Sequence, residues 1–317
     1  MKLELLSPAG SFECAKAAID AGADAIYMGG AKYGARAFAK STSDYSIIDS
    51  INFAKENGKK FYLTVNTLFK QRELKEIFLF LDPIVAAGVD AFIVQDLGVA
   101  MLLKNKYPKV ELHASTQMTI TSSKAINLVK SLGFTQVVLA RELSIKEIKA
   151  IKKEIGDDIK LEAFIHGSMC YCYSGACLMS SFIGGESGNR GRCKGPCRLP
   201  YSVGADTIRP HRRGEACEPA PYILSMKDMC ALNSLSGLVN AGVTSFKIEG
   251  RMRQVDYVYG TTKTYRKYLD AIRSGEHREP DIKKDEAYLL QLYNKGGFTN
   301  YYDKHNSTDM IQRYERK

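Results

Sequence analysis

Cysteine side chains are concentrated in one stretch of this 317-residue chain. Glycines recur throughout the stretch and leave its backbone free to bend, and an apolar run at residues 161–165 leads the chain into it. Thiols on pliable backbone at the end of a strand predict a bound metal centre, either an iron–sulfur cluster or a zinc ion. Five of the eight cysteines lie within twenty-eight residues: Cys170, Cys172, Cys177, Cys193 and Cys197.

The spacing of these cysteines favours four of them as ligands, in the order Cys170-x6-Cys177-x15-Cys193-x3-Cys197. Four thiolates suit either a [4Fe–4S] cluster or a tetrahedral zinc ion. Zinc ribbons usually pair their cysteines as C-x2-C, so the spacings found here favour the cluster. Reduced, inert core thiols are the competing interpretation, but packing alone rarely produces so dense a group.

The other cysteines have less certain roles. Cys172 stands two residues after Cys170 and would point away from it on extended backbone. Cys230 and Cys217 remain open as replacements for one of the four ligands. Cys14 lies in a predicted helix and is expected to pack in the core.

A thiol peptidase is the alternative chemistry for this stretch. It needs a cysteine nucleophile with a base nearby, and His166 could serve Cys170 as that base with Glu162 orienting the imidazole. A lone nucleophile does not account for the other thiols, and a histidine in such a position is more often a hydrogen-bonded loop residue than a base. The chain has no H-E-x-x-H pattern, so zinc-peptidase chemistry has no support.

Short apolar runs alternate with helical stretches from the N-terminus onward. Four times a glycine ends a helical stretch shortly before the next strand, at Gly22, Gly88, Gly133 and Gly242. This repeated joint favours parallel strands, and about eight strand–helix units predict an α/β fold, a (β/α)₈ TIM-like barrel over residues 1–275. A doubly wound open sheet is the competitor, weakened because no G-x-G-x-x-G follows the first strand. The predicted strands are Leu3–Leu6, Ala25–Met28, Phe61–Val65, Ala91–Val94, Glu111–Ala114, Gln136–Leu139, Leu161–Ile165 and Ser245–Ile248, with Ile223–Ser225 as a candidate extra strand.

The connection between the last two barrel strands is too long for an ordinary loop. We interpret residues 166–222 as a Cys-rich insertion after the seventh strand that folds around its metal. Helices are predicted over Val255–Ile272 and Asp285–Asn294. Residues 276–317 are interpreted as the start of a C-terminal extension that is cut short.

Polar side chains follow the ends of several strands, where barrel enzymes carry their active sites. Arg141 or Arg251 could clamp a small dicarboxylate through paired hydrogen bonds, with Lys247 and Gln117 as further contacts. Glu249 is a catalytic candidate, or it pairs with Arg251. Hydrogen bonding to a loop is the commoner role for any one of these residues.

The chain carries a formal net charge of +10, and between residues 190 and 213 seven Lys or Arg face one acid. This concentration predicts that Arg190, Arg192 and their neighbours bind the phosphates of RNA. No apolar run reaches the ~18 residues needed to cross a bilayer. No leader precedes the first strand, so we expect a cytoplasmic protein with reduced thiols and no membrane partner.

The stretch from Glu162 to Ser180 reads E-x-F-x2-G-S-M-C-x4-G-x-C-x-M-S. This pattern is specific, and it resembles the signature of the collagenase-like peptidase family U-32. The likeness extends from the N-terminus to about Phe298. The other similar stretches are Leu6–Gly10, Ala23–Tyr27, Ser115–Gln117 and Lys247–Arg251.

The resemblance implies a function that differs from the family's name. Several members support oxygen-independent hydroxylation of RNA or of a quinone precursor with a four-cysteine [4Fe–4S] cluster, and the RNA-directed members are linked to prephenate as the hydroxyl donor. The resemblance implies that Cys170, Cys177, Cys193 and Cys197 are ligands and that the target is a 23S rRNA cytidine or a tRNA uridine. Quinone-pathway members differ in their third and fourth thiols, so the fourth ligand stays open. Collagenase-like peptidase activity and non-catalytic, metal-stabilised RNA binding are the alternatives.

Overall fold

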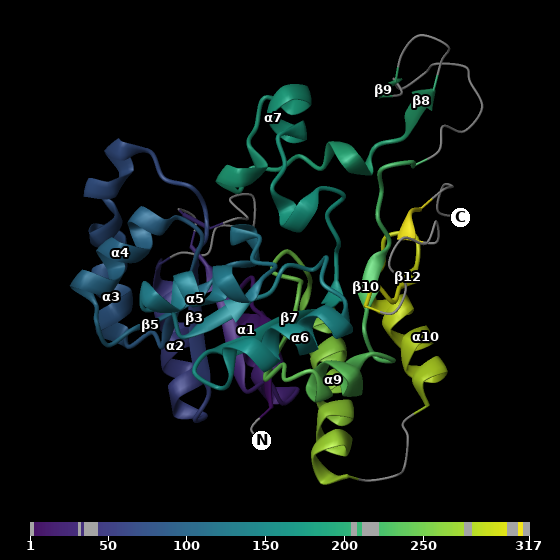
Figure 1. The fold of residues 1–317 in the computed structure, drawn as a ribbon, viewed down its shortest axis with the longest axis horizontal. Helices are drawn as coiled ribbons and strands as arrows, with labels where there is room; N and C mark the ends of the chain where they lie inside the picture. The colour runs from purple at the N-terminus through teal and green to yellow at the C-terminus, as the bar shows by residue number, and fades with distance from the viewer. Residues whose placement is uncertain are drawn as a thin grey trace.

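Eight parallel strands close into a barrel at the centre of the molecule (Figure 1). The computed structural model describes residues 3–30, 33–34, 44–203, 208–210, 222–275, 281–302 and 310–312. The strands are β1 (Glu4–Pro8), β2 (Ala25–Gly29), β3 (Lys60–Val65), β4 (Ala91–Val94), β5 (Glu111–Ala114), β6 (Gln136–Val138), β7 (Lys160–Gly167) and β11 (Ser245–Ile248). β1 to β7 pair in chain order, and β11 closes the ring by pairing with both β7 and β1. The predicted TIM-like barrel is confirmed.

Helices cover the outside of the barrel, and their ends follow the sequence signals. Ser144 and Glu147 form a capping box at the start of α6 (Ile145–Ile155). Gly88 ends α3 (Ile77–Ala87) with φ 92°, a left-handed conformation that glycine adopts without strain. Within the described ranges, no helix is both long and apolar enough to cross a membrane. The helices of the barrel layer are α1 (Phe12–Asp20), α2 (Asp44–Glu56), α3 (Ile77–Ala87), α4 (Leu97–Lys106), α5 (Ser123–Ser131), α6 (Ile145–Ile155), α8 (Leu235–Asn240) and α9 (Val255–Ser274).

Alternate strand residues fill the interior of the barrel. Leu6, Tyr27 and Tyr62 belong to a small apolar cluster there, and each is at most 2% exposed. A larger hydrophobic core lies between the barrel and its helices. Glu162 and Lys247 are also buried, so their charges must be satisfied by partners inside the protein.

The insertion leaves the barrel at the end of β7. Gly167 turns the chain there with φ 106°, and a Cβ at this position would lie 2.5 Å from the carbonyl oxygen of Glu249, so only glycine fits. The candidate extra strand at Ile223–Ser225 is wrong, because residues 223 and 224 form a turn. The elements that follow β7 are α7 (Met179–Gly184), the antiparallel pair β8 (Tyr201–Val203) and β9 (Ile208–Pro210), and β10 (Asp228–Cys230), which returns antiparallel to β7.

The chain after the barrel packs on the edge that β10 creates. β12 (Phe298–Thr299) pairs in parallel with β10, and α10 (Ile282–Leu292) packs against α9. Figure 1 shows β10, β12 and α10 together on one side of the barrel, with α7, β8 and β9 projecting above it. The helix predicted over Asp285–Asn294 is α10, which begins earlier because the Asp281 side chain accepts the Lys284 amide.

Candidate active site

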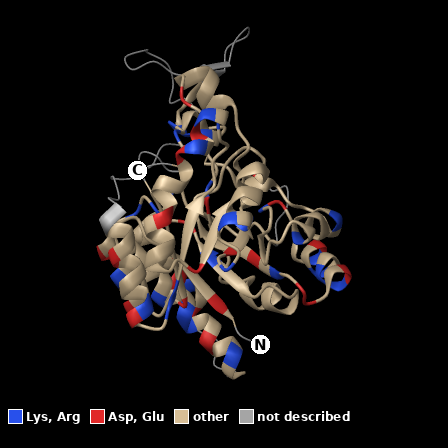
Figure 2. Cartoon of the chain, turned by 90° about the vertical axis from the view of Figure 1, so that its left-hand side faces the viewer, with Lys and Arg blue, Asp and Glu red and all other residues tan. Residues whose placement is uncertain are grey.

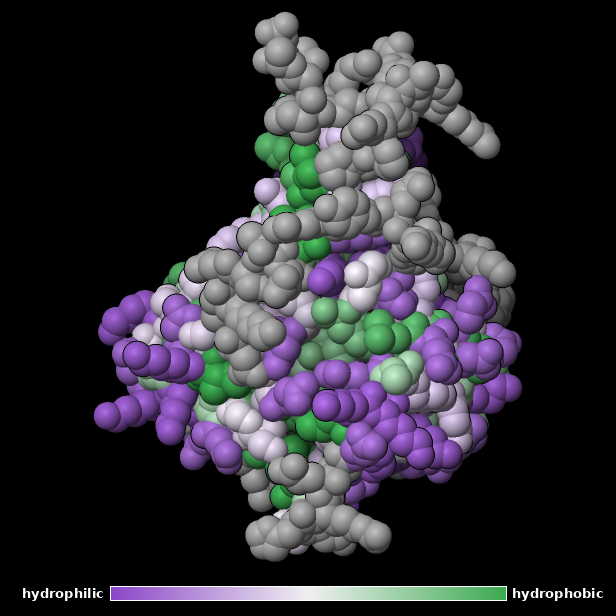
Figure 3. Space-filling model, turned by 90° about the vertical axis from the view of Figure 1, so that its right-hand side faces the viewer, coloured by the Kyte–Doolittle hydropathy of each residue, from purple (hydrophilic) through white to green (hydrophobic). Residues whose placement is uncertain are grey.

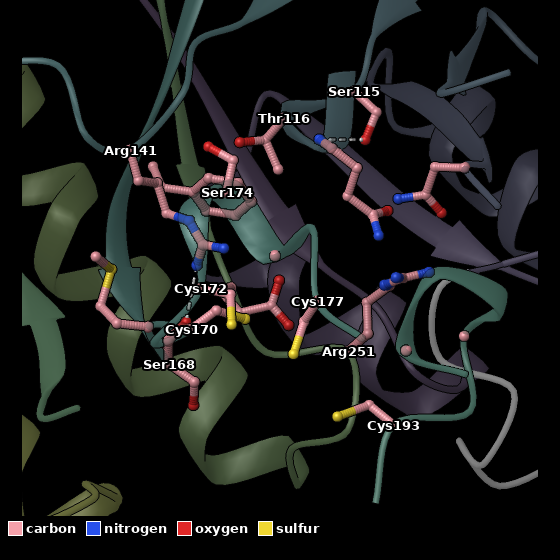
Figure 4. Close-up of a pocket in the computed structure, with 18 of the residues that line it drawn as sticks. Ser115, Thr116, Arg141, Ser168, Cys170, Cys172, Ser174, Cys177, Cys193 and Arg251 are labelled. Carbon is pink, nitrogen blue, oxygen red and sulfur yellow. Dashed lines mark hydrogen bonds between the residues drawn. The ribbon is translucent and has the colours of Figure 1, made fainter. Parts of the chain in front are cut away.

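A pocket of about 250 Å³ lies where the carboxyl ends of the barrel strands meet the insertion. Tyr27, Phe164 and Lys247 are among the barrel residues that line it, and insertion residues between 168 and 198 line another part. Figure 4 shows the thiols on one side of this space, with Arg141 and Arg251 to either side of them. The strand ends and the Cys-rich insertion therefore form one chamber.

All four predicted ligand cysteines line this pocket. Backbone amides support two of the sulfurs: the Met179 nitrogen lies 3.4 Å from Cys177 Sγ, and the Gly195 nitrogen lies 3.3 Å from Cys193 Sγ. Amide donors of this kind orient and tune metal-bound sulfur. In the part of the chain that the structure describes, no three His, Cys, Asp or Glu side chains converge closely enough to hold a single metal ion.

Cys172 does not point away from the cluster of thiols, contrary to expectation. It lines the same pocket as Cys170 and hydrogen-bonds to Cys177. Ser174 follows with φ 43°, so this segment is a tight turn rather than extended backbone. Burial, the Cys177 hydrogen bond and the charges of neighbouring thiolates raise the pKa of Cys172 to about 12. Cys172 is therefore a fifth thiol of the pocket, and its surroundings favour the protonated form.

The remaining cysteines lie elsewhere. Cys230 sits on β10 outside the pocket, within 3.7 Å of the Tyr265 hydroxyl, and burial raises its pKa to about 12. This placement argues against Cys230 as a replacement ligand. Cys14 packs in α1 as predicted, and Cys217 lies outside the described residues.

The predicted peptidase base is misplaced. His166 does not line the pocket; its ring contacts Tyr257, Tyr265 and Phe298, and its Nδ1 lies 3.3 Å from the Tyr265 hydroxyl. The cause is a bulge, because β7 carries one extra residue opposite β11 between Phe164 and His166. Phe164 faces the pocket, and the extra residue turns His166 towards α9 instead. The predicted partnership of His166 with Cys170 is wrong.

Glu162 does not orient His166 either. Its carboxylate is fully buried and accepts hydrogen bonds from Lys247 Nζ at 2.8 Å, from the Ser245 hydroxyl at 3.2 Å and from the Gln136 amide. Glu162 does not line the pocket, whereas Lys247 does. The role predicted for Glu162 is therefore corrected: it holds Lys247 in place on the pocket floor.

The burial of His166 predicts a pH dependence of stability. Desolvation lowers its pKa from 6.5 to about 3, so it is neutral in the folded protein at pH 7. The unfolded state binds a proton first as the pH falls, so stability is lost from about pH 6.5 towards pH 3 at a limiting slope of about 1.4 kcal/mol per pH unit. Urea unfolding between pH 7 and about 4.5 should show that the free energy of unfolding falls less steeply for His166→Phe than for the wild type. Equal declines in the two proteins would contradict the lowered pKa of His166.

The three residues predicted to bind a carboxylate are among the basic residues that line the pocket. Arg251 is buried and donates from Nη1 to the Thr64 hydroxyl at 2.6 Å. Arg141 is buried and donates to the Ser168 carbonyl at 3.1 Å. Since Lys247 lies between them on β11, the structure brings the three predicted carboxylate-binding residues together.

Gln117 and Glu249 also line the pocket, as predicted for strand ends. The Gln117 side-chain oxygen is buried and has no hydrogen-bond partner within the described residues. Ser168 was missed by the sequence analysis: its hydroxyl accepts from Arg253 at 3.1 Å while its carbonyl accepts from Arg141. Its place beside Cys170 on the strand-end turn was the available signal.

Two arginines that were predicted to bind RNA form ion pairs with acidic side chains. Arg190 forms a two-pronged ion pair with Glu73, with one N–O distance of 2.8 Å, and also bonds the Leu68 carbonyl. Arg192 Nε lies 2.8 Å from Glu186 Oε2. Figure 2 shows basic and acidic residues side by side in the projecting part of the chain. Arg190 therefore anchors the insertion to the loop after β3, which corrects its predicted phosphate-binding role. The Arg192 side chain is 53% exposed, and its phosphate-binding role stays a prediction.

Several known proteins are similar in sequence to this chain over most of the chain's length. The chain is 43% identical over 271 residues to the 23S rRNA 5-hydroxycytidine C2501 synthase of Escherichia coli K12, covering 86% of this chain and 40% of that protein. It is 38% identical over 274 residues to tRNA hydroxylation protein P1 of Bacillus subtilis 168, covering 85% and 64%. It is 32% identical over 324 residues to a collagenase of Porphyromonas gingivalis W83, covering 98% and 76%.

The chain spans less than two thirds of the length of the first two of these relatives. The sequence profile of one family, peptidase family U32, matches residues 10–312, nearly the whole chain. Every barrel strand except β1, and all residues that line the thiol-containing pocket, fall inside the matched residues. The match confirms the resemblance carried by the Glu162–Ser180 stretch, and the chain belongs to peptidase family U32.

Proposed function

We propose that this chain is the catalytic part of a cytoplasmic, oxygen-independent RNA hydroxylase. It would modify a 23S rRNA cytidine or a tRNA, since relatives are named for 5-hydroxycytidine synthesis in 23S rRNA and for tRNA hydroxylation. The family resemblance implies a uridine as the tRNA target. The donor of the hydroxyl group would be a small dicarboxylate, with prephenate implied by the family resemblance. The observation that carries the proposal is that one pocket joins the predicted ligand cysteines to Arg141, Lys247 and Arg251.

The pocket residues fit a [4Fe–4S] cluster better than a zinc ion. A tetrahedral zinc site requires four donors about 2.0–2.3 Å from one point, whereas a cluster separates its four thiolates around a cube. Cys170, Cys177, Cys193 and Cys197 share one pocket without converging on a point, and amides donate to two of the sulfurs. Bound there, a cluster would supply a redox or Lewis-acid centre at the mouth of the barrel.

The protein's own residues would bind and orient the two substrates. Arg141 and Arg251 would each hold a carboxylate of the donor. Tyr171 and Tyr173 flank the thiols and are 48% and 55% exposed, so they offer ring faces on which an unpaired RNA base can stack. Tyr171 also lines the pocket, which supports entry of the base from this side.

The test combines metal analysis with nucleoside mass spectrometry. Anaerobically purified protein is expected to be brown and to hold about four irons per chain. Ribosomal and transfer RNA from a strain lacking the gene should contain one nucleoside lighter by one oxygen, and a plasmid-borne copy of the gene should restore the hydroxylated nucleoside. A colourless protein that contains zinc would contradict the proposed [4Fe–4S] cluster.

The same experiment separates the alternative functions. Unchanged RNA in the deletion strain, with salt-sensitive RNA binding by the purified protein, would indicate a non-catalytic RNA-binding factor. The peptidase alternative loses support from the position of His166, which is buried against α9 and outside the pocket. Hydrolysis of gelatin that is lost in a Cys170→Ala variant would support a peptidase, whereas hydrolysis that persists in this variant would point to a contaminating protease.

A further inference from the structure

Lys247 occupies a central position among the pocket cations. The sheet order β6-β7-β11-β1-β2-β3 places the residues in the sequence Arg141, Phe164, Lys247, Tyr27, with the Arg251 guanidinium reaching the far side. The Lys247 nitrogen lies 4.5 Å from the Tyr27 ring centroid and 5.5 Å from that of Phe164. Arg251 lies 5.8 Å from the first ring and Arg141 lies 5.3 Å from the second. Cations and aromatic rings therefore alternate around the barrel, with the lysine in the middle.

The lysine also lies deeper than its two neighbours. Lys247 is a residue of β11 itself, whereas Arg141 and Arg251 follow the ends of their strands. An acid whose two carboxylates bind the arginines would thus present its central atoms to the lysine nitrogen. The group that suits this nitrogen is a carbonyl, so the arrangement points to a dicarboxylate with a 2-oxo group on the chain between its carboxylates.

The surroundings of Lys247 meet the requirements for a nucleophilic amine. A lysine is activated when it is desolvated, and Lys247 is 4% exposed, with the Phe164 and Tyr27 rings between it and the guanidiniums of Arg141 and Arg251. It also needs a proton acceptor, and the Glu162 carboxylate lies 2.8 Å from its nitrogen. The Gln136 and Ser245 hydrogen bonds fix that carboxylate in place.

We propose that Lys247 forms a reversible imine with the carbonyl carbon of a 2-oxo dicarboxylate. The ammonium gives a proton to Glu162, and the neutral nitrogen attacks the carbonyl carbon to form a carbinolamine. Glu162 returns the proton to the hydroxyl group, which leaves as water while the C=N bond forms. Hydrolysis reverses the sequence, and no oxidant or reductant takes part. The inference rests on the proposed binding of a small dicarboxylate in this pocket.

Borohydride trapping tests the imine directly. Anaerobically purified protein is incubated with prephenate or with 2-oxoglutarate, reduced with sodium borohydride and mapped by peptide mass spectrometry. The expected result is a mass increase equal to the acid less one oxygen on the peptide that carries Lys247. Glutarate, which lacks the 2-oxo group, should give no adduct. Lys295→Met removes another pocket lysine and should leave the adduct unchanged.

The outcomes distinguish this inference from the proposed function. Binding of the oxo acids by calorimetry without an adduct, or an adduct on any lysine other than Lys247, would overturn the imine and leave the dicarboxylate site standing. If none of the three acids binds, both the dicarboxylate site and the imine are overturned. Lys247→Arg should abolish the adduct; because the wild-type peptide map locates the modified lysine by itself, the test does not depend on whether this variant folds.

Discussion

Replacement of Cys193 by serine is expected to remove the iron and abolish RNA hydroxylation. Serine presents a hard oxygen that iron–sulfur clusters accept poorly in place of a thiolate. It would also lose the sulfur that the Gly195 amide supports. The loss of activity should exceed the roughly 10- to 100-fold that removal of a supporting residue costs at a metal site. Iron analysis after anaerobic purification and nucleoside mass spectrometry of the complemented deletion strain measure the two effects.

Matched cysteine variants make this prediction specific. Cys14→Ser and Cys230→Ser remove thiols outside the pocket and should keep the iron, although both introduce a buried hydroxyl and lower stability. Cys172→Ser removes the fifth pocket thiol and should keep the iron as well, because four other thiols remain. Full iron in Cys193→Ser, or loss of iron in Cys172→Ser, would contradict the ligand set drawn from the spacing.

The barrel was predictable because its signals are local. Each of the eight strands is a short apolar run, and a glycine at positions such as Gly88 ends the preceding helix. β10 and β12 were not predictable in the same way, since both are at most three residues long. Their pairing with the end of β7 and with each other is set by tertiary contacts rather than by a pattern in their own residues.

The positions of the site residues were predictable where the spacing in the sequence sets them. They were not predictable where a partner distant in the sequence sets them. Cysteine density located the pocket wall, but the bulge that turns His166 out of the pocket arises from the pairing of β7 with β11. A count of basic residues could not foresee that Arg190 pairs with Glu73, 117 positions away. Nor does the sequence show that Lys247 and Glu162, 85 positions apart, meet inside the barrel.

That buried pair carries the largest expected effect on stability. Lys247→Met should destabilise the fold by about 3–5 kcal/mol, the usual cost when one member of a buried ion pair is removed. The methionine fills the space, so the penalty comes from the Glu162 carboxylate, which is fully buried and loses its only ion-pair partner in the described part of the chain. Urea denaturation at pH 7 measures the change, and a loss below about 1 kcal/mol would show that solvent reaches the carboxylate.

The double variant Glu162→Gln/Lys247→Met isolates the charge from the packing. A neutral amide can keep a hydrogen bond with Ser245, so the double variant should be closer to the wild type than Lys247→Met is, because no buried charge remains. Urea denaturation of both variants at pH 7 measures the difference in their free energies of unfolding. Equal losses in the single and double variants would show that packing, and not the buried charge of Glu162, sets the penalty.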